Sequence, residues 1–409
     1  YPEIKQVVDS LSEENIDVTF TVQLLPIMKG IYSTTYINFE GVLRSDMVKI
    51  YQDYYDALKN ITVVDKPPDL LGAGGTNDCK LFLQTTTTDN QILVTERPGK
   101  LRIIENWQLS DPIKNLPKIE SIGQGGLLDI ALDPNFKNNQ IIYLSYSSGN
   151  FLGIGTEVIK AKLNDNRLEN IKVLFQLKPK SRGGRHFGSR LLTTTNRIYI
   201  TLGDRGEPER AQNLNDHAGS LIRINNDGSL PKDNPFIERP DVRPEIYTYG
   251  HRNIQGIASD PITGNIWTIE HGPQGGDELN LIRSGMNYGW PVITHGVNYV
   301  TGTKIGEGTH KENMLQPIHY WVPSIATSSV IFYSGEQFPA WKGNIFVSSL
   351  KFGQLARLEI KNNRVIKEER LLNGELGRIR EIKEGPDGFL YLITDESNGK
   401  LFRIKPVGR

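Results

Sequence analysis

The sequence predicts an all-β fold, a six-bladed β-propeller with four-stranded antiparallel blades, and three observations lead to it. A strand-turn-strand pattern recurs six times along most of the chain. No long amphipathic helix interrupts this array, which argues against an α/β fold. The 409 residues include 40 Gly and 22 Pro, and their scatter indicates many turns between short strands. A unit of up to four short strands cannot bury its own faces, but six such units around an axis can.

In each copy a β-branched run ends in a polar or glycine turn, and a short second run with a Leu or Ile pair follows. The copies span residues 92–104, 141–163, 198–224, 266–282, 345–360 and 390–404. The copies are spaced about 45 to 80 residues apart, and the shortest of these spacings matches the length of a propeller blade. A pair of β-sandwiches is the alternative, and the regular recurrence of the pattern disfavours it.

Residues 1–60 differ from the rest and predict a short N-terminal α/β extension. Asn15–Leu25 alternates like a strand. Ser45–Asn60 predicts a helix, because Ser45 can cap it and its apolar residues share one face. These are Met47, Ile50, Tyr51, Tyr54 and Leu58, a stripe typical of core or of a docking surface. We therefore divide the chain into an extension, 1–60, and a propeller catalytic domain, 61–409.

The bulk composition excludes several classes of protein. Lys+Arg and Asp+Glu are both 47, so no basic excess favours nucleic acid as a partner. The sequence contains no run of about 18 apolar residues, so it predicts no membrane-spanning helix. The single cysteine, Cys79, excludes an intramolecular disulfide framework. The chain begins at Tyr1, so we expect a processed or trimmed product in which a signal peptide is not visible.

Residues 247–291 carry the densest group of polar side chains. They include the pair Arg252-Asn253, the bend Gly272-Pro273 and the acidic pair Asp277-Glu278, followed by a turn that contains Tyr288. Polar groups of this kind at the ends of strands predict a functional site on loops that a rigid sheet scaffold holds in place. Carbonyls freed by the bend, together with the two carboxylates, are hard oxygen donors that suit calcium better than zinc or iron.

Two further segments carry candidates for chemistry. In IGQGGLLDIA (122–131) Gln124 stands at a strand entrance, where it can donate and accept hydrogen bonds. In GGRHFGSRL (183–191) His186 lies in a glycine-rich loop. Histidine is the side chain whose ordinary pKa suits a base near neutral pH.

Four basic residues could meet at the mouth of a propeller channel. Arg378 and Arg380 are two apart on an extended segment and so share one face. Together with Lys351 and Arg252 they would form a cationic cluster suited to a ligand with several carboxylates. The alternative is ordinary surface charge.

Taken together, several motifs resemble the soluble aldose sugar dehydrogenases of the PQQ-dependent glucose/sorbosone dehydrogenase family. They are GQGGLLDIALDPNF, RHFGSRL, LGDRG, HAGSLIRINNDG, YGHRNIQGIA, EHGPQGGDELNLI, NYGWP and GPDGFLYLITDESNGKLFRI. The resemblance covers about residues 66 to 406, and it implies a six-bladed propeller. It also implies an extracytoplasmic location, periplasmic or otherwise.

The resemblance implies a role for each candidate. His186 corresponds to the general base, and Gln124 lines the substrate and cofactor pocket. Arg252 and Asn253 correspond to the pair over the quinone carbonyls of PQQ. The residues that would hold the PQQ carboxylates are Lys351, Arg378 and Arg380.

The resemblance also implies calcium. The backbone carbonyls of Gly272 and Pro273 correspond to ligands of the calcium ion that bridges to PQQ. A further, structural calcium is implied at Asp277, Glu278 and Tyr288. Two residues depart from the glucose enzymes of the family: Arg185 stands where they carry an Asp that supports the base, and Arg205 where they carry Gln. Both departures put a preference for glucose in doubt.

The expected activity is oxidation of the anomeric hydroxyl of an aldose to the lactone, with PQQ and Ca²⁺ as cofactors and an external electron acceptor. A non-catalytic propeller that binds a glycan or protein partner is the alternative from another class. A calcium-dependent lactonase is a third, but it would have no use for Lys351, Arg378 and Arg380.

Overall fold

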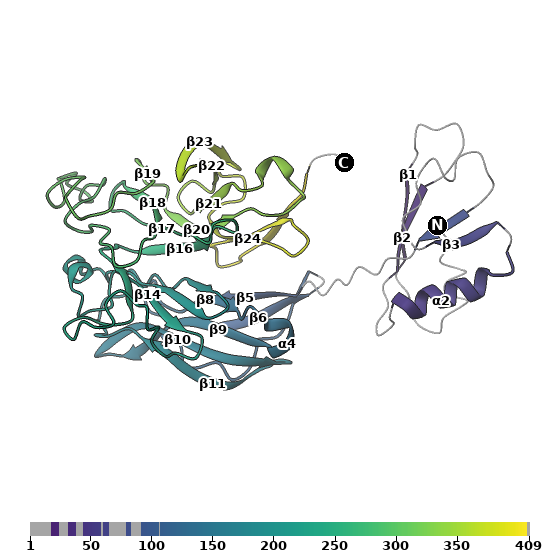
Figure 1. Ribbon diagram of the computed structural model, residues 1–409, viewed down its shortest axis with the longest axis horizontal. Coiled ribbons are helices and arrows are strands. Elements are labelled where there is room, and N and C mark those ends of the chain that lie inside the picture. The colour runs from purple at the N-terminus through teal and green to yellow at the C-terminus, as the bar shows by residue number, and fades with distance from the viewer. Residues whose placement is uncertain are drawn as a thin grey trace. The chain divides into compact units, whose positions relative to one another are not determined.

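The computed structural model describes residues 18–23, 32–37, 44–58, 60–64, 79–82, 91–105 and 107–406. The chain divides into two compact units, residues 1–89 and 90–409 (Figure 1). The boundary predicted after residue 60 therefore lies inside the first unit and moves to residue 89. The reason is local pairing: β3 (Ile61–Val64) runs parallel to β4 (Cys79–Phe82) and contacts α2 (Arg44–Tyr55).

In the first unit the described residues form a hairpin, a helix and the β3–β4 pair. β1 (Val18–Gln23) pairs antiparallel with β2 (Tyr32–Ile37). The strand and the helix predicted in this segment are both present, although the helix ends at Tyr55. Ile50 is 56% and Tyr54 64% exposed. This part of the tyrosine-rich helix face is therefore not core, which leaves a docking surface as its interpretation.

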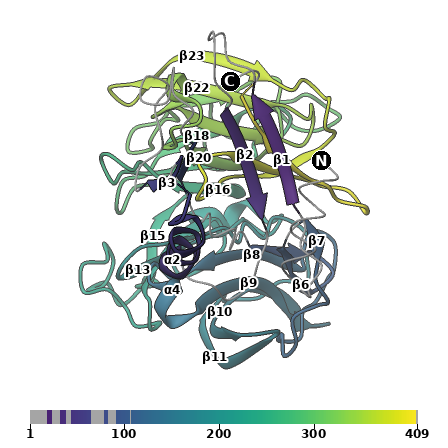
Figure 2. The ribbon, with the colours of Figure 1, turned by 90° about the vertical axis from the view of Figure 1, so that its right-hand side faces the viewer.

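The second unit is the predicted six-bladed propeller, built from six antiparallel sheets whose strands follow one another along the chain. Blades 2 to 5 have four strands each, as expected, whereas blades 1 and 6 have three among the described strands. Figure 2 shows β8, β9, β10 and β11 of blade 2 in that order from the middle of the unit to its edge.

The bounds of the strands are as follows. Blade 1 contains β5 (Ile92–Glu96), β6 (Lys100–Glu105) and β7 (Gln108–Leu109). Blade 2 contains β8 (Leu127–Leu132), β9 (Ile141–Asn150), β10 (Gly153–Asn164) and β11 (Arg167–Gln176). Blade 3 contains β12 (Leu191–Thr193), β13 (Arg197–Thr201), β14 (Ser220–Asn225) and β15 (Ile246–Tyr249).

Blade 4 contains β16 (Ile254–Ser259), β17 (Ile266–Glu270), β18 (Asp277–Leu281) and β19 (His319–Trp321). Blade 5 contains β20 (Thr327–Phe332), β21 (Ile345–Ser349), β22 (Leu355–Lys361) and β23 (Arg364–Leu371). Blade 6 contains β24 (Ile379–Glu384), β25 (Leu390–Thr394) and β26 (Leu401–Ile404). Short helical turns between strands are α4 (Phe136–Asn139), η1 (Pro208–Gln212) and η2 (Pro339–Trp341).

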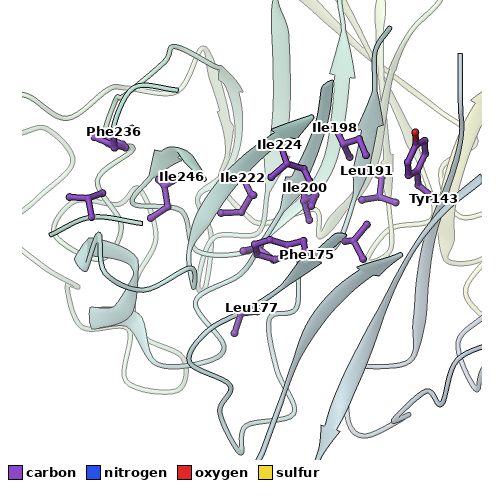
Figure 3. Close-up of a cluster of buried hydrophobic side chains, with 13 residues drawn as sticks. Tyr143, Phe175, Leu177, Leu191, Ile198, Ile200, Ile222, Ile224, Phe236 and Ile246 are labelled. Carbon is purple, nitrogen blue, oxygen red and sulfur yellow. The ribbon is translucent and has the colours of Figure 1, made fainter. Parts of the chain in front are cut away.

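The hydrophobic core lies between the blades. Figure 3 shows the cluster between blades 2 and 3, where Tyr143 and Phe175 pack with Ile198 and Ile222. Similar buried clusters join each further pair of consecutive blades from 1 to 6. Burying one large aliphatic or aromatic side chain contributes about 1.5 to 3 kcal/mol, so this interlocking holds the blades in a fixed arrangement. Between blades 6 and 1, the Arg403 guanidinium lies 5.3 Å from the Trp107 ring.

One buried cation joins five of the blades. Arg190, just before β12, donates from Nε to the Gln255 carbonyl at 2.9 Å and from Nη2 to the Ser328 carbonyl at 2.6 Å. Its Nη1 is hydrogen-bonded to Glu381 and lies 3.5 Å from Asp129 Oδ1. These partners belong to blades 2, 4, 5 and 6, so Arg190 anchors the inner strands on which the site loops are mounted.

Candidate active site

A histidine and an aspartate from two loops of blade 3 form the centre of the site. His186 Nδ1 lies 2.6 Å from Asp204 Oδ1. Burial acts to raise the pKa of Asp204, but the hydrogen bond and charge of His186, the Gly206 N–H and the charge of Arg252 together lower it. Asp204 is therefore ionised and can only accept, so the imidazole donates from Nδ1, and in the neutral ring it is Nε2 that carries the lone pair.

The backbone around this pair is tightly constrained. His186 has φ 50°, in the left-handed region that non-glycine residues seldom occupy. The adjoining loop approaches so closely that a Cβ on Gly203 would lie 2.3 Å from the His186 carbonyl oxygen. A rare backbone conformation persists only where its surroundings enforce it, so the position of His186 is set by the fold.

Two of the predicted pocket residues support the same loop. Gln124 Oε1 accepts the His186 backbone N–H at 2.8 Å. Asn253 Oδ1 accepts the Gly188 N–H at 3.1 Å. The structure thus brings Gln124, His186 and Asn253 together, as the sequence predicts.

Arg252 lies beside the His186–Asp204 pair with part of its guanidinium uncommitted. Its carbonyl accepts the Asp204 N–H at 2.8 Å, and its Nη1 donates to the His271 carbonyl at 3.1 Å. The guanidinium carbon is 5.4 Å from the Trp290 ring. Arg252 is 8% exposed, yet its buried Nε has no hydrogen-bond partner among the described residues. A buried donor without a partner is costly, so this N–H suits a ligand oxygen.

Two residues of the predicted cationic cluster, Arg378 and Arg380, lie together beside β24 of blade 6. Arg378 and Arg380 both reach Asp395 Oδ2, at 2.9 and 3.1 Å, and Arg378 also donates to the Leu350 carbonyl at 3.4 Å. The neighbouring Lys351 forms no ion pair within the described part of the chain; its Nζ is 5.0 Å from the Phe352 ring. Arg378 and Arg380 share the single carboxylate of Asp395, and Lys351 is not paired with it, so positive charge remains for an anionic ligand.

His271 connects this cluster with Arg252. Burial lowers the pKa of His271 to about 4, opposed by Asp277 and assisted by the positive charges of Arg252 and Arg380. The neutral ring donates from Nε2 to the Thr327 carbonyl at 2.6 Å. The ring of His271 lies beside Arg252, whose Nη1 donates to the His271 carbonyl.

The Gly272-Pro273 bend presents unpaired carbonyl oxygens. Both residues are buried, and no hydrogen bond from the described residues reaches either carbonyl. The Asp277 carboxylate shapes this turn, since it accepts the Gly272 N–H at 3.0 Å and the Ala326 N–H at 2.7 Å, as well as the Ser324 hydroxyl. Within the described ranges no group of three or more His, Cys, Asp or Glu side chains is placed to hold a metal ion. Any cation here would therefore rely on carbonyls.

Glu278 and Tyr288 border a small cavity next to Arg252. The cavity has a volume of about 10 Å³ and is lined also by Glu270 and Gly272. Burial, and then the charge of Glu270, raises the pKa of Glu278 well above its usual range. The Tyr288 hydroxyl donates to the Leu281 carbonyl at 2.7 Å, so its phenol is already committed within the protein.

The comparisons with known proteins follow the same division of the chain. The family model for glucose/sorbosone dehydrogenases matches residues 82–403. The chain belongs to this family. It is a sugar dehydrogenase of the propeller type. Among the described residues, no helix is long and apolar enough to cross a membrane.

Relatives and solved structures agree with this assignment. The aldose sugar dehydrogenase YliI of Escherichia coli is 39% identical over 325 residues, which cover 77% of this chain and 86% of that protein. Quinoprotein glucose dehydrogenase B of Acinetobacter calcoaceticus is 30% identical over 394 residues, covering 75% of this chain and 81% of that protein. A crystal structure of a glucose dehydrogenase superimposes with a TM-score of 0.76 at 42% identity, covering 79% of this chain and 95% of that one.

The N-terminal segment of this glucose/sorbosone dehydrogenase has a different relationship. Residues 1–97 match the family model for the dimerisation domain of semialdehyde dehydrogenases. An N-acetyl-gamma-glutamyl-phosphate reductase of Clostridium beijerinckii is 33% identical over 96 residues, which cover 23% of this chain and 28% of that protein. The sequence analysis found no counterpart for residues 1–60.

Two site residues of this dehydrogenase were not assigned from sequence, Asp204 and Trp290. Both lie in turns that the sequence analysis singled out, LGDRG and NYGWP, yet the pattern does not show that both reach His186. Trp290 donates its indole N–H to Asp204 Oδ2 at 2.8 Å. The carboxylate beside His186 thus comes from Asp204. Arg185, where the resemblance implies an Asp in glucose enzymes, is exposed.

Proposed function

We propose that this protein oxidises the anomeric hydroxyl of an aldose to the lactone, with PQQ and calcium as cofactors and an external acceptor that takes up the electrons. The observation that carries the proposal is the His186–Asp204 pair beside a buried Arg252 with an unpaired Nε. A base, its orienting carboxylate and a fixed cation are the parts that removal of a hydroxyl proton and stabilisation of a developing negative charge require.

His186 acts as the base through Nε2. The Asp204 carboxylate holds the proton on Nδ1 and stabilises the imidazolium that forms once Nε2 takes the hydroxyl proton. Trp290 in turn fixes the second oxygen of Asp204. The side chain of His186 is 14% exposed, so it is open to a substrate while most of its ring is held by the loop.

The residues suit the cofactor that the family implies. The chemistry that PQQ supplies when bound is acceptance of two electrons from the anomeric carbon. Arg252 and Asn253 would meet its quinone oxygens, with Gln124 beside them. Lys351, Arg378 and Arg380 would pair with its carboxylates, and the single Asp395 leaves them cationic overall. The name quinoprotein, carried by the Acinetobacter relative, agrees with this choice.

Calcium would be held by the Gly272 and Pro273 carbonyls. Their oxygens are buried and without donors among the described residues, and hard oxygens are what Ca²⁺ prefers. The Glu270–Glu278 cavity supports a further cation, because a positive ion would relieve the repulsion that raises the pKa of Glu278. Asp277 and Tyr288 are the other oxygen donors assigned to this further calcium, and like Glu270 and Glu278 they also hydrogen-bond within the protein.

The deciding experiment adds PQQ and calcium to the apoprotein and follows reduction of a dye by a panel of aldoses. Turnover that needs both additions and an aldose is expected. Binding of sugars without any dye reduction would favour the alternative, a propeller that only binds glycans. Hydrolysis of lactones by calcium-loaded protein without PQQ would favour a lactonase.

We further propose that the first unit joins two copies of the chain and that the protein works outside the cytoplasm. The first proposal is supported by the match to a dimerisation domain and by the exposed Ile50 and Tyr54 on α2. The second follows from the family resemblance and is tested by fractionating cells of the source organism.

A further inference from the structure

Arg205 is the most deeply buried arginine beside the active site, and the proposed reaction gives it no role. It follows Asp204 directly in the chain, has φ 63° and is 1% exposed. Arg205 stands where the glucose enzymes of the family are expected to carry Gln, a departure that puts a preference for glucose in doubt. Its side chain instead turns toward the loop that carries His186.

The guanidinium holds this loop at three points. Nη1 donates to the Arg185 carbonyl and Nη2 to the Gly183 carbonyl. Its carbon lies 3.5 Å from the centre of the Phe187 ring, a stacked cation–π contact. Arg185 and Phe187 are the residues on either side of His186. The guanidinium therefore contacts the loop directly before and directly after the base.

A cation in this position is costly to bury. Burial, and then the charge of Arg210, lowers the pKa of Arg205 to about 10, against the opposing charges of Asp204 and Glu207. No carboxylate is hydrogen-bonded to it, and its Nε has no partner among the described residues. A buried charge without a hydrogen-bonded carboxylate normally destabilises a protein. Two carbonyls two residues apart require a planar fork of donors, which lysine lacks.

We propose that Arg205 is a positioning residue that sets the distance and alignment between His186 and Asp204. The two members of the pair lie on separate loops. Arg205 is covalently next to one and bonded to the loop of the other, so a single side chain spans the gap between them. This inference rests on the proposed function only for its effect on turnover, because the hydrogen bond itself exists without cofactor or sugar.

The test uses the full chain with Arg205→Lys, which keeps the charge and loses the fork, and Arg205→Gln. The first measurement is the downfield proton resonance of His186 Nδ1–H in protein labelled with ¹⁵N at histidine, assigned by its loss in His186→Gln. In both Arg205 variants we expect this resonance to shift or broaden. The control, Arg182→Lys, changes an exposed residue of the same loop and should leave the resonance in place.

The second measurement is kinetic, after reconstitution with PQQ and calcium. We expect kcat to fall by about 10- to 100-fold, the scale of a misplaced catalytic group. PQQ affinity should be unchanged, and the limb of the pH–kcat profile that reports ionisation of the base should shift. Phe187→Leu keeps both carbonyl hydrogen bonds and should move the same signals less. It also serves as the deciding variant if the Arg205 substitutions do not fold.

An unaltered resonance, pH limb and kcat in folded Arg205→Lys would overturn the proposal. So would equal losses of kcat and PQQ affinity, which indicate general disruption of the site. If the parent protein oxidises no aldose, the proposed function fails, but the resonance still decides whether Arg205 aligns the His186–Asp204 pair.

Discussion

Trp290 donates its indole N–H to the oxygen of Asp204 that His186 does not use, at 2.8 Å. The indole belongs to the connection between β18 and β19 of blade 4, whereas the carboxylate belongs to blade 3. Both oxygens of Asp204 are therefore fixed from different parts of the propeller. A carboxylate held in this way cannot rotate away from the imidazole. The orientation of the His186 ring is therefore fixed by residues from both blade 3 and blade 4.

Replacing Asp204 with Asn should lower turnover by at least about 100-fold, the usual effect of losing a correctly oriented base. PQQ binding should persist, because the cationic cluster is untouched. His186→Gln should show the same pattern, and Trp290→Phe a smaller loss. Turnover at saturating PQQ and direct cofactor titration, measured separately, check this. Near-normal turnover in Asp204→Asn would remove the pair from the mechanism.

The cationic cluster should govern cofactor affinity. Arg380→Ala or Lys351→Ala should weaken PQQ binding at least about tenfold, mainly through faster release, with turnover at saturating PQQ little changed. Asp395→Asn should have the opposite sign, since it removes the carboxylate that competes for Arg378 and Arg380. Arg370→Ala, a partly exposed arginine of β23, is the control. If the cluster variants bind PQQ as tightly as the parent, these residues are ordinary surface charge.

Calcium should be required for reconstitution. Apoprotein treated with chelator and given PQQ alone should show no dye reduction, and added calcium should restore it. The physical reason is that the Gly272 and Pro273 carbonyls accept no hydrogen bond from the described residues and are hard oxygen donors of the kind that Ca²⁺ prefers. Full activity from PQQ without calcium would show that this bend has another role.

Glu368 should make stability depend on pH. The hydrogen bond from His319, opposed by burial and assisted by Arg370 and Trp321, lowers the pKa of Glu368 to about 2. The pKa is lower in the folded state, so the contribution is full above about pH 4.3 and is lost as the pH falls toward 2. At most roughly 3 kcal/mol is involved. Denaturation of the parent and Glu368→Gln between pH 6 and 2 should converge at the acid end; parallel curves would contradict the assignment.

The first unit should be separable from catalysis. A chain that begins at Asn90 should fold, oxidise sugar at a rate within about twofold of the full chain, and be monomeric by light scattering, whereas the full chain should be dimeric. Every assigned site residue lies between Gln124 and Arg380, which is the reason for this expectation. A folded chain without turnover would place part of the site in residues 1–89, and a dimeric one would place the contact in the propeller.

The propeller could be predicted from the sequence because its strands repeat the same pattern. The turns around Gln124, His186 and Arg252 could be singled out because glycines and unpaired polar residues stand together there. The boundary could not be predicted, because β3 and β4 resemble propeller strands by composition while they pair in parallel with each other. The role of Asp204 was also missed, since its contact with His186 depends on how two loops approach in space.

The buried guanidinium of Arg190 has a consequence for how the molecule loses its structure. Arrays of repeats in which each unit contacts only its neighbours can unravel from one end. Here a single residue bonds to inner strands of blades on every side of it. Loss of blade 2 or blade 6 would remove one of the two carboxylates that balance Arg190, and loss of blade 4 or blade 5 would leave its N–H groups without a carbonyl partner. Partly unfolded forms that keep some blades are therefore penalised, and the propeller should melt in a single step.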